Sequence, residues 1–283
     1  MLMRGHISGL EFQPNSGFEY GSVTLTGQNL LDVVEVAIGD VPAPVFTVVT
    51  PSRISALVPA GARTGPISIK TNSDLLTSAE QFVVIPGSSP TSDFDQRDLL
   101  TQSEVPESRW YVRARGGWGP RPREYRPVDP PASCDPIAWK RARVTAVAMR
   151  YIGLEYRPHH IPRWNPDPAL VGEEEAGMGL DCSNFTAWVY NYALGISFVS
   201  KVEKQAKGPR APGRKLDRDE PLAPGDLLFI RNLKQTRLSH VAINIDGTHI
   251  IDSHRGHDYY GVHIREFQGW HSKCFAWARR VIE

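Results

Sequence analysis

Short runs of alternating apolar and polar residues fill the first third of the chain, and they restrict its fold more than any other feature. Such alternation suits β-strands, because successive side chains of a strand point to opposite faces of a sheet. Turns rich in Gly, Pro, Asn and Asp separate the runs at nearly regular spacing. Residues 7 to about 85 are therefore predicted to form a small β-sandwich. The clearest runs are 22–26 (SVTLT), 34–38 (VEVAI), 54–58 and 67–71.

The composition is that of a globular protein whose charges nearly cancel. Of the 283 residues 41% are hydrophobic, and 32 basic residues stand against 31 acidic ones, which gives a net charge of +1. This balance favours neither nucleic acid nor an anionic membrane as a partner. The N-terminal sequence MLMRGHISGLEF lacks the apolar run of a signal peptide, and no stretch is apolar enough for a membrane span. We therefore expect no nucleic-acid partner and no membrane span.

The chain changes character after residue 85. Residues 86–134 open with the polar stretch PGSSPTSDFD, which indicates a flexible linker, and continue with RWYVRARGGWGPRPREYRPVDPP. The second stretch is rich in Pro, Gly, Arg and aromatic residues, so we predict an ordered strap. Its Trp110, Trp118 and Tyr125 are expected to lie on a neighbouring surface, because these rings are costly to leave in water. Binding of nucleic acid or a sugar polymer is the alternative, but no basic face elsewhere extends the stretch.

From residue 135 the pattern is that of an α+β domain, which we place at 135–283. Asp135 can cap a helix that reaches about residue 151, with Pro136 in its first turn. A second helix is predicted to begin at Cys182. Strands are predicted at 226–230, 240–245 and 249–254, with a further apolar run at 274–282.

Cys182 is the first candidate for a catalytic residue. Apolar residues follow it at helical spacing, at Phe185, Val189 and Tyr192, which places the cysteine in the first turn of a helix, on its buried face. There the unpaired backbone NH groups and the helix dipole favour a thiolate, and they can also hold an oxyanion. The alternative is an inert buried thiol. A base near the thiol would favour the catalytic role over this alternative.

The cysteine count leaves at least one thiol free, or paired outside the chain. The three cysteines, Cys134, Cys182 and Cys274, lack the CxxC spacing of a zinc site. A disulfide between Cys134 and Cys274 and a pair of free thiols both remain open.

His240 is the candidate base, because it opens the apolar strand SHVAINI and a strand holds a side chain rigidly at the rim of a sheet. A solvated histidine at a sheet edge is the alternative. The next strand supplies the orienting partner, and the length of the intervening turn decides which residue it is. With a three-residue loop over 246–248, Asp252 lies diagonal to His240 on the same face. The same loop puts His254 opposite His240, whereas a two-residue turn puts Ser253 there.

The other histidines do not indicate a metal site. Two adjacent side chains of an extended segment point apart, and the spacing HxxxxHxxH does not bring three nitrogens to one face. We therefore predict no metal and no cofactor. The histidines concerned are His159, His160, His249, His254 and His257.

Three blocks of the C-terminal region carry a family resemblance. GLDCSNFTAWVY, APGDLLFI and SHVAINIDGTHIIDSH resemble consecutive blocks of the NlpC/P60 family of papain-like cysteine peptidases, over about residues 136–282. The resemblance implies that Cys182 is the nucleophile and His240 the general base. It assigns the third polar residue to Asp252, where the family often has histidine, with His254 in reserve.

The resemblance also concerns substrate contacts. YIGLEYR resembles the block before the nucleophile and matches Tyr156 to a tyrosine that lines the site, while Ser183 is expected to contribute to the oxyanion site. After Tyr156 the family has a short glycine-rich link, whereas this chain has PHHIPRWNPDPALVGEEEAGM, which we expect to affect specificity. Residues 173–175 together with Arg157 and Arg163 are candidates for a groove with charges of both signs.

The implied activity is hydrolysis of peptide stems in bacterial peptidoglycan, typically next to D-glutamate and a diamino acid. Related papain-like sites also carry out acyl transfer or deamidation, so an acyltransferase or deamidase is the alternative. A C-terminal domain without activity is a third possibility. A cell-wall substrate implies action outside the cytoplasm, or delivery to the wall by a secretion machine.

The N-terminal third resembles a known β module. ISGLEFQPNSG, GSVTLTGQNL, PSRISALVPAGARTGPISIKTNSD and FVVIP resemble an IPT/TIG domain, an immunoglobulin-like module, within residues 1–85. Its expected role is that of a spacer, a protein contact or a contact with a cell-wall polymer. The expected fold class is therefore multidomain, with an N-terminal all-β immunoglobulin-like sandwich and a C-terminal α+β papain-like domain of the NlpC/P60 type.

Overall fold

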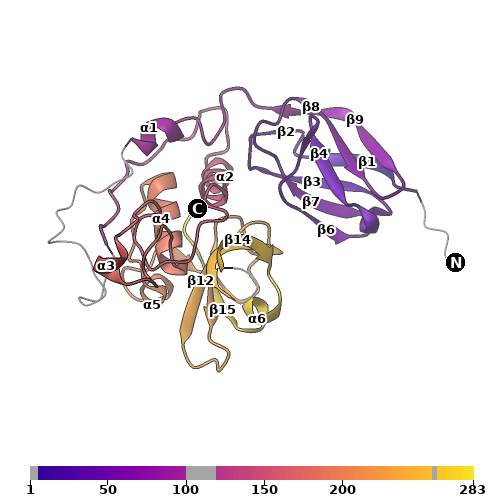
Figure 1. Ribbon diagram of the computed structural model, residues 1–283. Coiled ribbons are helices and arrows are strands. Elements are labelled where there is room, and N and C mark those ends of the chain that lie inside the picture. The colour runs from indigo at the N-terminus through magenta and orange to yellow at the C-terminus, as the bar shows by residue number, and fades with distance from the viewer. Residues whose placement is uncertain (1–5, 100–118, 257–259) are drawn as a thin grey trace. The chain divides into compact units, whose positions relative to one another are not determined.

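The computed structural model describes residues 6–99, 119–256 and 260–283 (Figure 1). The chain divides into two compact units, of which the first comprises Met1–Pro90 with Asp129–Ala142 and the second comprises Thr91–Val128 with Arg143–Glu283. The first unit thus takes up residues from both ends of the predicted linker and strap, and the domain boundaries after residues 85 and 134 stay predictions.

The first unit contains two β-sheets that enclose one hydrophobic core, which confirms the predicted sandwich. In β3 (Ser22–Gln28) every second side chain is buried. Leu25 from one sheet and Ile38 and Ile67 from the other are fully shielded from solvent. The four-stranded sheet has the order β1 (Ser8–Gln13), β3, β7 (Arg53–Leu57) and β6 (Phe46–Thr50). The five-stranded sheet has the order β2 (Ser16–Gly17), β9 (Leu75–Val84), β8 (Gly65–Lys70), β4 (Glu35–Ile38) and β5 (Val41–Pro42).

The second unit is built on a six-stranded antiparallel sheet. Its order is β10 (Arg214–Lys215), β15 (Phe275–Arg280), β11 (Leu227–Arg231), β12 (Leu238–Asn244), β13 (His249–Arg255) and β14 (Tyr260–Glu266). The helices are α1 (Phe94–Asp98), α2 (Pro136–Met149), which begins in the first unit, α3 (Pro168–Val171), α4 (Cys182–Leu194), α5 (Val202–Ala206) and α6 (Gly269–Lys273). The predicted strands and the two longer helices are confirmed, whereas β10, β14 and the short helices are additional. Within the described ranges no helix is long and apolar enough to cross a membrane.

Helix α4 is buried on all sides, although its sequence pattern indicates a single buried face. Strands β12 and β13 contact it. Tyr125 covers another side, where its backbone NH donates to Asn191 Oδ1 at 3.1 Å and its ring centroid lies 5.1 Å from that of Tyr192. Trp110 and Trp118, assigned to the same strap, lie outside the described residues. Because α4 has neighbours all around, its first turn is held rigidly.

Two aspartates fix the segment 91–98, although the sequence assigns residues 86–95 to a flexible linker. The side chain of Arg143 is completely buried and donates a hydrogen bond of 3.0 Å to Asp93 Oδ2. Asp98 Oδ1 accepts a hydrogen bond of 3.0 Å from Arg150. A buried guanidinium needs a partner charge, and Asp93 supplies it for Arg143. The end of the predicted linker is therefore an ordered part of the second unit.

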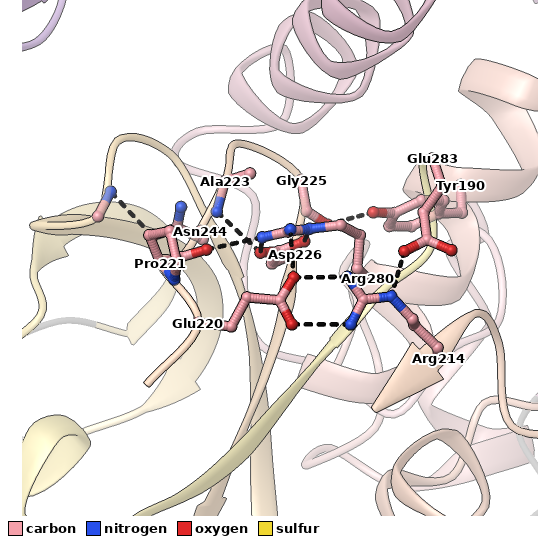
Figure 2. A network of polar contacts seen from close by, with 11 residues as sticks. Tyr190, Arg214, Glu220, Pro221, Ala223, Gly225, Asp226, Asn244, Arg280 and Glu283 are labelled. Atoms are coloured by element: carbon pink, nitrogen blue, oxygen red, sulfur yellow. Dashed lines mark hydrogen bonds and ion pairs between the residues drawn. The ribbon is translucent and has the colours of Figure 1, made fainter. Parts of the chain in front are cut away.

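A polar network fixes the start of β11 against α4 (Figure 2). Asp226, in the APGD turn, accepts a hydrogen bond from the Ala223 NH at 2.8 Å and one from Arg280 Nε of β15 at 3.0 Å. The carbonyl oxygen of Gly225 accepts a hydrogen bond from the hydroxyl of Tyr190, which belongs to α4. These contacts join α4, β11 and β15, so the helix and the sheet keep one relative position.

A three-residue loop joins β12 to β13, which is the longer of the two turns that the sequence allows. Ile243 pairs with Ile251, and the Ile245 NH donates to the carbonyl oxygen of His249 at 2.9 Å, which leaves residues 246–248 as the loop. When this register continues, Ala242 lies opposite Asp252, so Asp252 is on the same face as His240. The register that favours Asp252 over Ser253 is therefore the one that forms.

Asp246 holds this loop, and its replacement by alanine is expected to destabilise the hairpin. Its Oδ1 accepts hydrogen bonds from the NH groups of Thr248 at 2.9 Å and His249 at 2.6 Å, and its Oδ2 lies 3.0 Å from His249 Nδ1. We expect Asp246→Ala to lower the free energy of unfolding by about 1–2 kcal/mol in urea titrations. Asp246→Asn keeps an acceptor and is expected to cost less. Equal stability of Asp246→Ala and wild type would contradict this role.

The contribution of Asp246 to stability is also expected to depend on pH. Burial raises the pKa of this carboxyl, but the His249 ring and the loop NH groups outweigh it and lower the pKa to about 2. An unfolded aspartate has a pKa of about 4, so the stabilisation is complete above that pH and is lost as the pH falls towards about 2. The stability difference between wild type and Asp246→Ala should therefore shrink on acidification.

Candidate active site

Cys182 is the first residue of α4, as predicted. Asp181 caps the helix and accepts a hydrogen bond from the Asn184 NH at 2.8 Å. The hydroxyl of Ser183 lies 3.0 Å from Asp181 Oδ1 and 3.2 Å from the carbonyl oxygen of Ser200. The Ser183 side chain is thus engaged with the protein itself. The expected contribution of Ser183 to oxyanion binding stays a prediction, and the group that would bind the oxyanion is its backbone NH.

The thiol of Cys182 is less acidic than the helix dipole alone suggests. Burial, and then the negative charge of Asp181, raise the pKa of Cys182 well above its ordinary value. The backbones of Val241 and Ser183 act in the opposite direction without compensating. The dipole argument from the sequence took account of the helix but not of the depth at which the thiol is buried. In the resting state Cys182 is therefore protonated, and a base has to remove its proton during the reaction.

Removal of the Asp181 charge is expected to make Cys182 more reactive. Asp181→Asn keeps a side-chain oxygen as the helix cap but removes the ionisable carboxyl beside the thiol, so the pKa of Cys182 should fall wherever that carboxyl is ionised. Burial raises the pKa of Asp181, so the effect should grow with rising pH. Each pKa unit changes the thiolate fraction about tenfold, and we expect alkylation by iodoacetamide at about pH 8 to accelerate several-fold.

A matched control for this prediction is Asp135→Asn. Asp135 also caps a helix, with its Oδ1 accepting from the Ala138 NH at 2.7 Å, but it stands before α2. This variant should leave the alkylation rate of Cys182 unchanged. An equal rate in wild type and Asp181→Asn would show that the charge of Asp181 does not control the thiol.

His240 and Asp252 are in direct contact. His240 Nε2 lies 2.6 Å from Asp252 Oδ2, and both side chains are buried. This contact occupies Nε2 and leaves Nδ1 on the opposite edge of the ring. Helix α4, which begins with Cys182, packs against β12 and β13, the strands that carry His240 and Asp252. The structure therefore pairs His240 with Asp252 and packs the helix that begins with Cys182 against their strands, and the catalytic roles of the three residues stay a prediction.

Asp252 has two further partners that the sequence reasoning missed. Arg265 Nε donates to Asp252 Oδ1 at 2.8 Å, and His271 Nε2 lies 3.1 Å from Asp252 Oδ2. Burial raises the pKa of Asp252, but His240, His271 and Arg265 outweigh it and hold the pKa far below its ordinary value. Asp252 is thus a carboxylate shared by two imidazoles and one guanidinium.

The two partners differ in how far the sequence could have revealed them. Arg265 belongs to β14, where it pairs with Ile250, so it lies diagonal to Asp252 on the same face. The alternation in YGVHIRE could have indicated this strand. His271 belongs to α6, a helix of only five residues, and no sequence pattern points to its position.

The reserve residue His254 lies beside the base and does not replace Asp252. Its ring centroid is 5.1 Å from that of His240. Burial, and then the neighbouring His240, lower the pKa of His254 to about 4, so its ring is neutral at physiological pH.

Tyr156 lies near the thiol, as the resemblance implies. Burial, and then the neighbouring Cys182, raise the pKa of Tyr156 well above its ordinary value. Its ring centroid lies 6.1 Å from that of Tyr260. Tyr156 is thus in a position to line the site, and its contact with substrate stays a prediction.

The long segment after Tyr156 is attached to the nucleophile helix. His160 Nδ1 lies 2.8 Å from Asn184 Oδ1 in the first turns of α4, whereas His159 Nε2 lies 2.7 Å from the carbonyl oxygen of Glu175. The two histidines therefore have different partners. Because the segment contacts the turn that carries Cys182, its conformation can influence what reaches the thiol.

The charged residues proposed for a groove are largely engaged within the protein. Arg157 pairs with Glu155 at 2.7 Å and donates to the carbonyl oxygen of Ala176 at 2.6 Å. Glu175 is buried, whereas Glu173 and Glu174 are exposed. Charged contacts with a substrate in this segment are therefore more restricted than the sequence suggests.

Cys134, Cys182 and Cys274 are all free thiols. The sequence left open either a disulfide between Cys134 and Cys274 or two free thiols, and the structure has the free thiols. Cys182 is buried at the start of α4, and Cys274 is buried in a hydrophobic cluster with Ile230 and Ile250.

Two family models match the chain. The model described as NlpC/P60 family matches residues 169–279, and the model described as IPT/TIG domain matches residues 10–84. The chain contains an NlpC/P60 domain. Cys182, His240 and Asp252 lie within the matched NlpC/P60 region, whereas Tyr156 precedes it. The predicted enzyme family and the predicted IPT/TIG module are therefore confirmed.

Several solved structures resemble this chain. A protein from Staphylococcus aureus, described as similar to lipoprotein, NLP/P60 family, is 21% identical, covers 56% of this chain and 44% of its own, and has a TM-score of 0.37. The NlpC/P60 domain of the peptidoglycan hydrolase SagA is 25% identical, with 50% and 97% covered and a TM-score of 0.35. The peptidoglycan hydrolase RipB from Mycobacterium tuberculosis is 17% identical, with 52% and 67% covered and a TM-score of 0.40.

These likenesses carry no argument about the activity of this chain, because the three TM-scores are at most 0.40. The chain spans 44% of the length of the Staphylococcus aureus protein. No curated protein matches the chain. The assignment to the NlpC/P60 family therefore rests on the family model and on the residues within it.

Proposed function

We propose that the NlpC/P60 domain is a cysteine peptidase that hydrolyses peptide stems of bacterial peptidoglycan. The observation that carries the reaction type is the 2.6 Å contact between His240 and Asp252, next to Cys182 at the start of α4. A nucleophile, a base and a carboxylate that orients the base are the parts that acyl transfer through a thioester requires. The substrate class comes from the NlpC/P60 resemblance.

The reaction begins with removal of the Cys182 proton by His240 Nδ1. The sulfur then attacks the amide carbonyl, and backbone NH groups in the first turn of α4 stabilise the oxyanion that forms. Protonated His240 gives the proton to the leaving amine, and a thioester remains on Cys182. Water, deprotonated by His240, releases the acyl group. Asp252 keeps the imidazole in the tautomer and orientation that these transfers need.

For the bond cleaved, we propose the linkage between D-glutamate and the diamino acid of the stem. The segment after Tyr156, held on α4 by the contact of 2.8 Å between His160 and Asn184, is the proposed determinant of this choice. Action outside the cytoplasm, or delivery to the wall by a secretion machine, follows from a cell-wall substrate. A protein or a cell-wall polymer is the proposed partner of the IPT/TIG domain.

Incubation of the full chain with defined stem peptides, followed by mass spectrometry, tests this function. The expected result is two products whose masses sum to that of the substrate plus one water, with a new amine on the diamino acid. A deamidase would instead release ammonia from an intact peptide, and an acyltransferase would give a product with the acceptor attached. Either result, or cleavage at another bond, would reject the corresponding part of the proposal.

A further inference from the structure

Four side chains that can bind a transition metal gather around the candidate base. They are His240 from β12, Asp252 and His254 from β13, and His271 from α6, and one ligand atom of each lies within 4.8 Å of those of the others. The centroids of the three imidazole rings are 5.1 to 5.6 Å apart. Of the histidines that the sequence argument considered for a metal, only His254 belongs to this cluster.

The donor atoms are those that Zn²⁺ and its neighbours prefer. Three imidazole nitrogens and one carboxylate oxygen can form a tetrahedral site, in which bonds of about 2.0–2.1 Å put the donor atoms about 3.3 Å apart. Asp252 Oδ2 already lies 2.6 Å from His240 Nε2 and 3.1 Å from His271 Nε2. Three of the four donors thus need only small rotations to reach this spacing.

His254 supplies an independent indication. Its Nδ1 is buried and has no hydrogen-bond partner among residues 6–99, 119–256 and 260–283. A buried nitrogen without a partner costs free energy, and such an atom is commonly satisfied by a ligand or an ion.

The positive charge of Arg265 disfavours a cation in this cluster, but the position of its guanidinium limits the repulsion. It donates to Asp252 Oδ1 at 2.8 Å, whereas the imidazoles of His240 and His271 share Oδ2. The oxygen needed by a metal is therefore the one that Arg265 does not use. The guanidinium charge still lowers the affinity, which favours an exchangeable ion over a permanent one.

We propose that His240, Asp252, His254 and His271 bind a transition-metal ion of the Zn²⁺ type reversibly, and that the bound ion switches the peptidase off. Binding replaces the hydrogen bond between His240 Nε2 and Asp252 by two metal bonds; the neutral ring gives up its Nε2 proton to solvent and takes up one proton from solvent on Nδ1, so it stays neutral. A ring bound through Nε2 carries its remaining proton on Nδ1, so it cannot accept the proton of Cys182. The binding half of the inference is independent of the proposed function, and the switching half rests on it.

Metal binding is tested on the full chain with Cys182→Ala, which removes the thiol as a ligand. Titration with ZnCl₂ by calorimetry is expected to give one ion per chain, and CoCl₂ is expected to give the visible absorption of a tetrahedral nitrogen and oxygen site. His254→Gln in the same background should weaken binding at least about tenfold. His249→Gln is the matched control, because His249 lies on the same strand but pairs with Asp246, and it should leave the affinity unchanged.

Binding of no ion at about 100 µM Zn²⁺, or equal affinity with and without His254, would overturn the site. Binding that disappears with Cys182→Ala would assign the ion to the thiol instead. Thermal melts establish whether His254→Gln folds, and if it does not, His271→Gln is measured with the same two outcomes.

Switching is tested on wild type with a stem peptide. Zn²⁺ should inhibit hydrolysis and a chelator should restore it, and His254→Gln should require at least about tenfold more Zn²⁺ for the same fractional inhibition. Binding without inhibition would reject the switch and leave the site. Absence of hydrolysis in metal-free wild type would count against the proposed function and would not affect the calorimetric result.

Discussion

Cys182→Ala is expected to reduce hydrolysis of a stem peptide by about a thousandfold or more, because no thioester can form without the sulfur. The thiol is the one in the first turn of α4, which packs against β12, the strand that carries the base. The measurement is the initial rate of amine release at low substrate, which reports kcat/KM.

Two further variants separate this role from packing. Cys182→Ser preserves the volume and the cap of α4 but has a weaker nucleophile, so it should also lose most of the activity. Cys134→Ala removes a free thiol that is only half-buried and lies outside the NlpC/P60 match, and it should stay within about twofold of wild type. If Cys182→Ala retains a tenth of the wild-type rate, Cys182 is not the nucleophile.

Asp252→Asn is expected to lower kcat by about a hundredfold to ten-thousandfold and to destabilise the fold by about 3 kcal/mol. The loss of activity follows because an amide can present the wrong atom to His240 Nε2 and does not stabilise an imidazolium. The loss of stability follows because Arg265 and His271 lose the charge that they share in a buried place. The rates come from single-turnover assays and the stability from urea titrations.

A double variant distinguishes the two effects. Asp252→Asn combined with Arg265→Gln removes both members of the buried ion pair, so it should recover part of the stability. Activity should not recover, because His240 still lacks a carboxylate partner. Recovery of activity in the double variant would mean that Asp252 serves the fold and does not orient the base.

The sequence pattern and the family resemblance together named the three candidate residues of the site. Cys182 followed from helical spacing, His240 from its place at a strand start, and Asp252 from the alternation of its strand. The pairing of β12 with β13 stayed open by one residue because turn length depends on side-chain contacts such as those of Asp246. The local sequence pattern therefore indicated the candidate site residues, whereas the side-chain contacts of the loop determine the register of β12 and β13.

The remaining site residues depend on tertiary contacts that no local pattern encodes. His271 comes from a helix of five residues, which is too short for a periodic signal. The raised pKa of Cys182 follows from burial and from Asp181, and the depth of burial is set by everything that packs around α4. For the same reason α4 is enclosed on all sides, whereas its spacing indicates a single apolar face.

The loop over residues 246–248 should tolerate change in composition far better than change in length. Most surface hairpins accept an inserted or deleted residue, because only the loop itself is rebuilt. Here one residue more or less would shift the pairing register of β12 and β13 by one residue. The face that carries His240 would then present Ser253 in place of Asp252. In a library of variants of this hairpin, those with an inserted or deleted residue should therefore be inactive. Point substitutions of Gly247 and Thr248 that keep the turn should remain active.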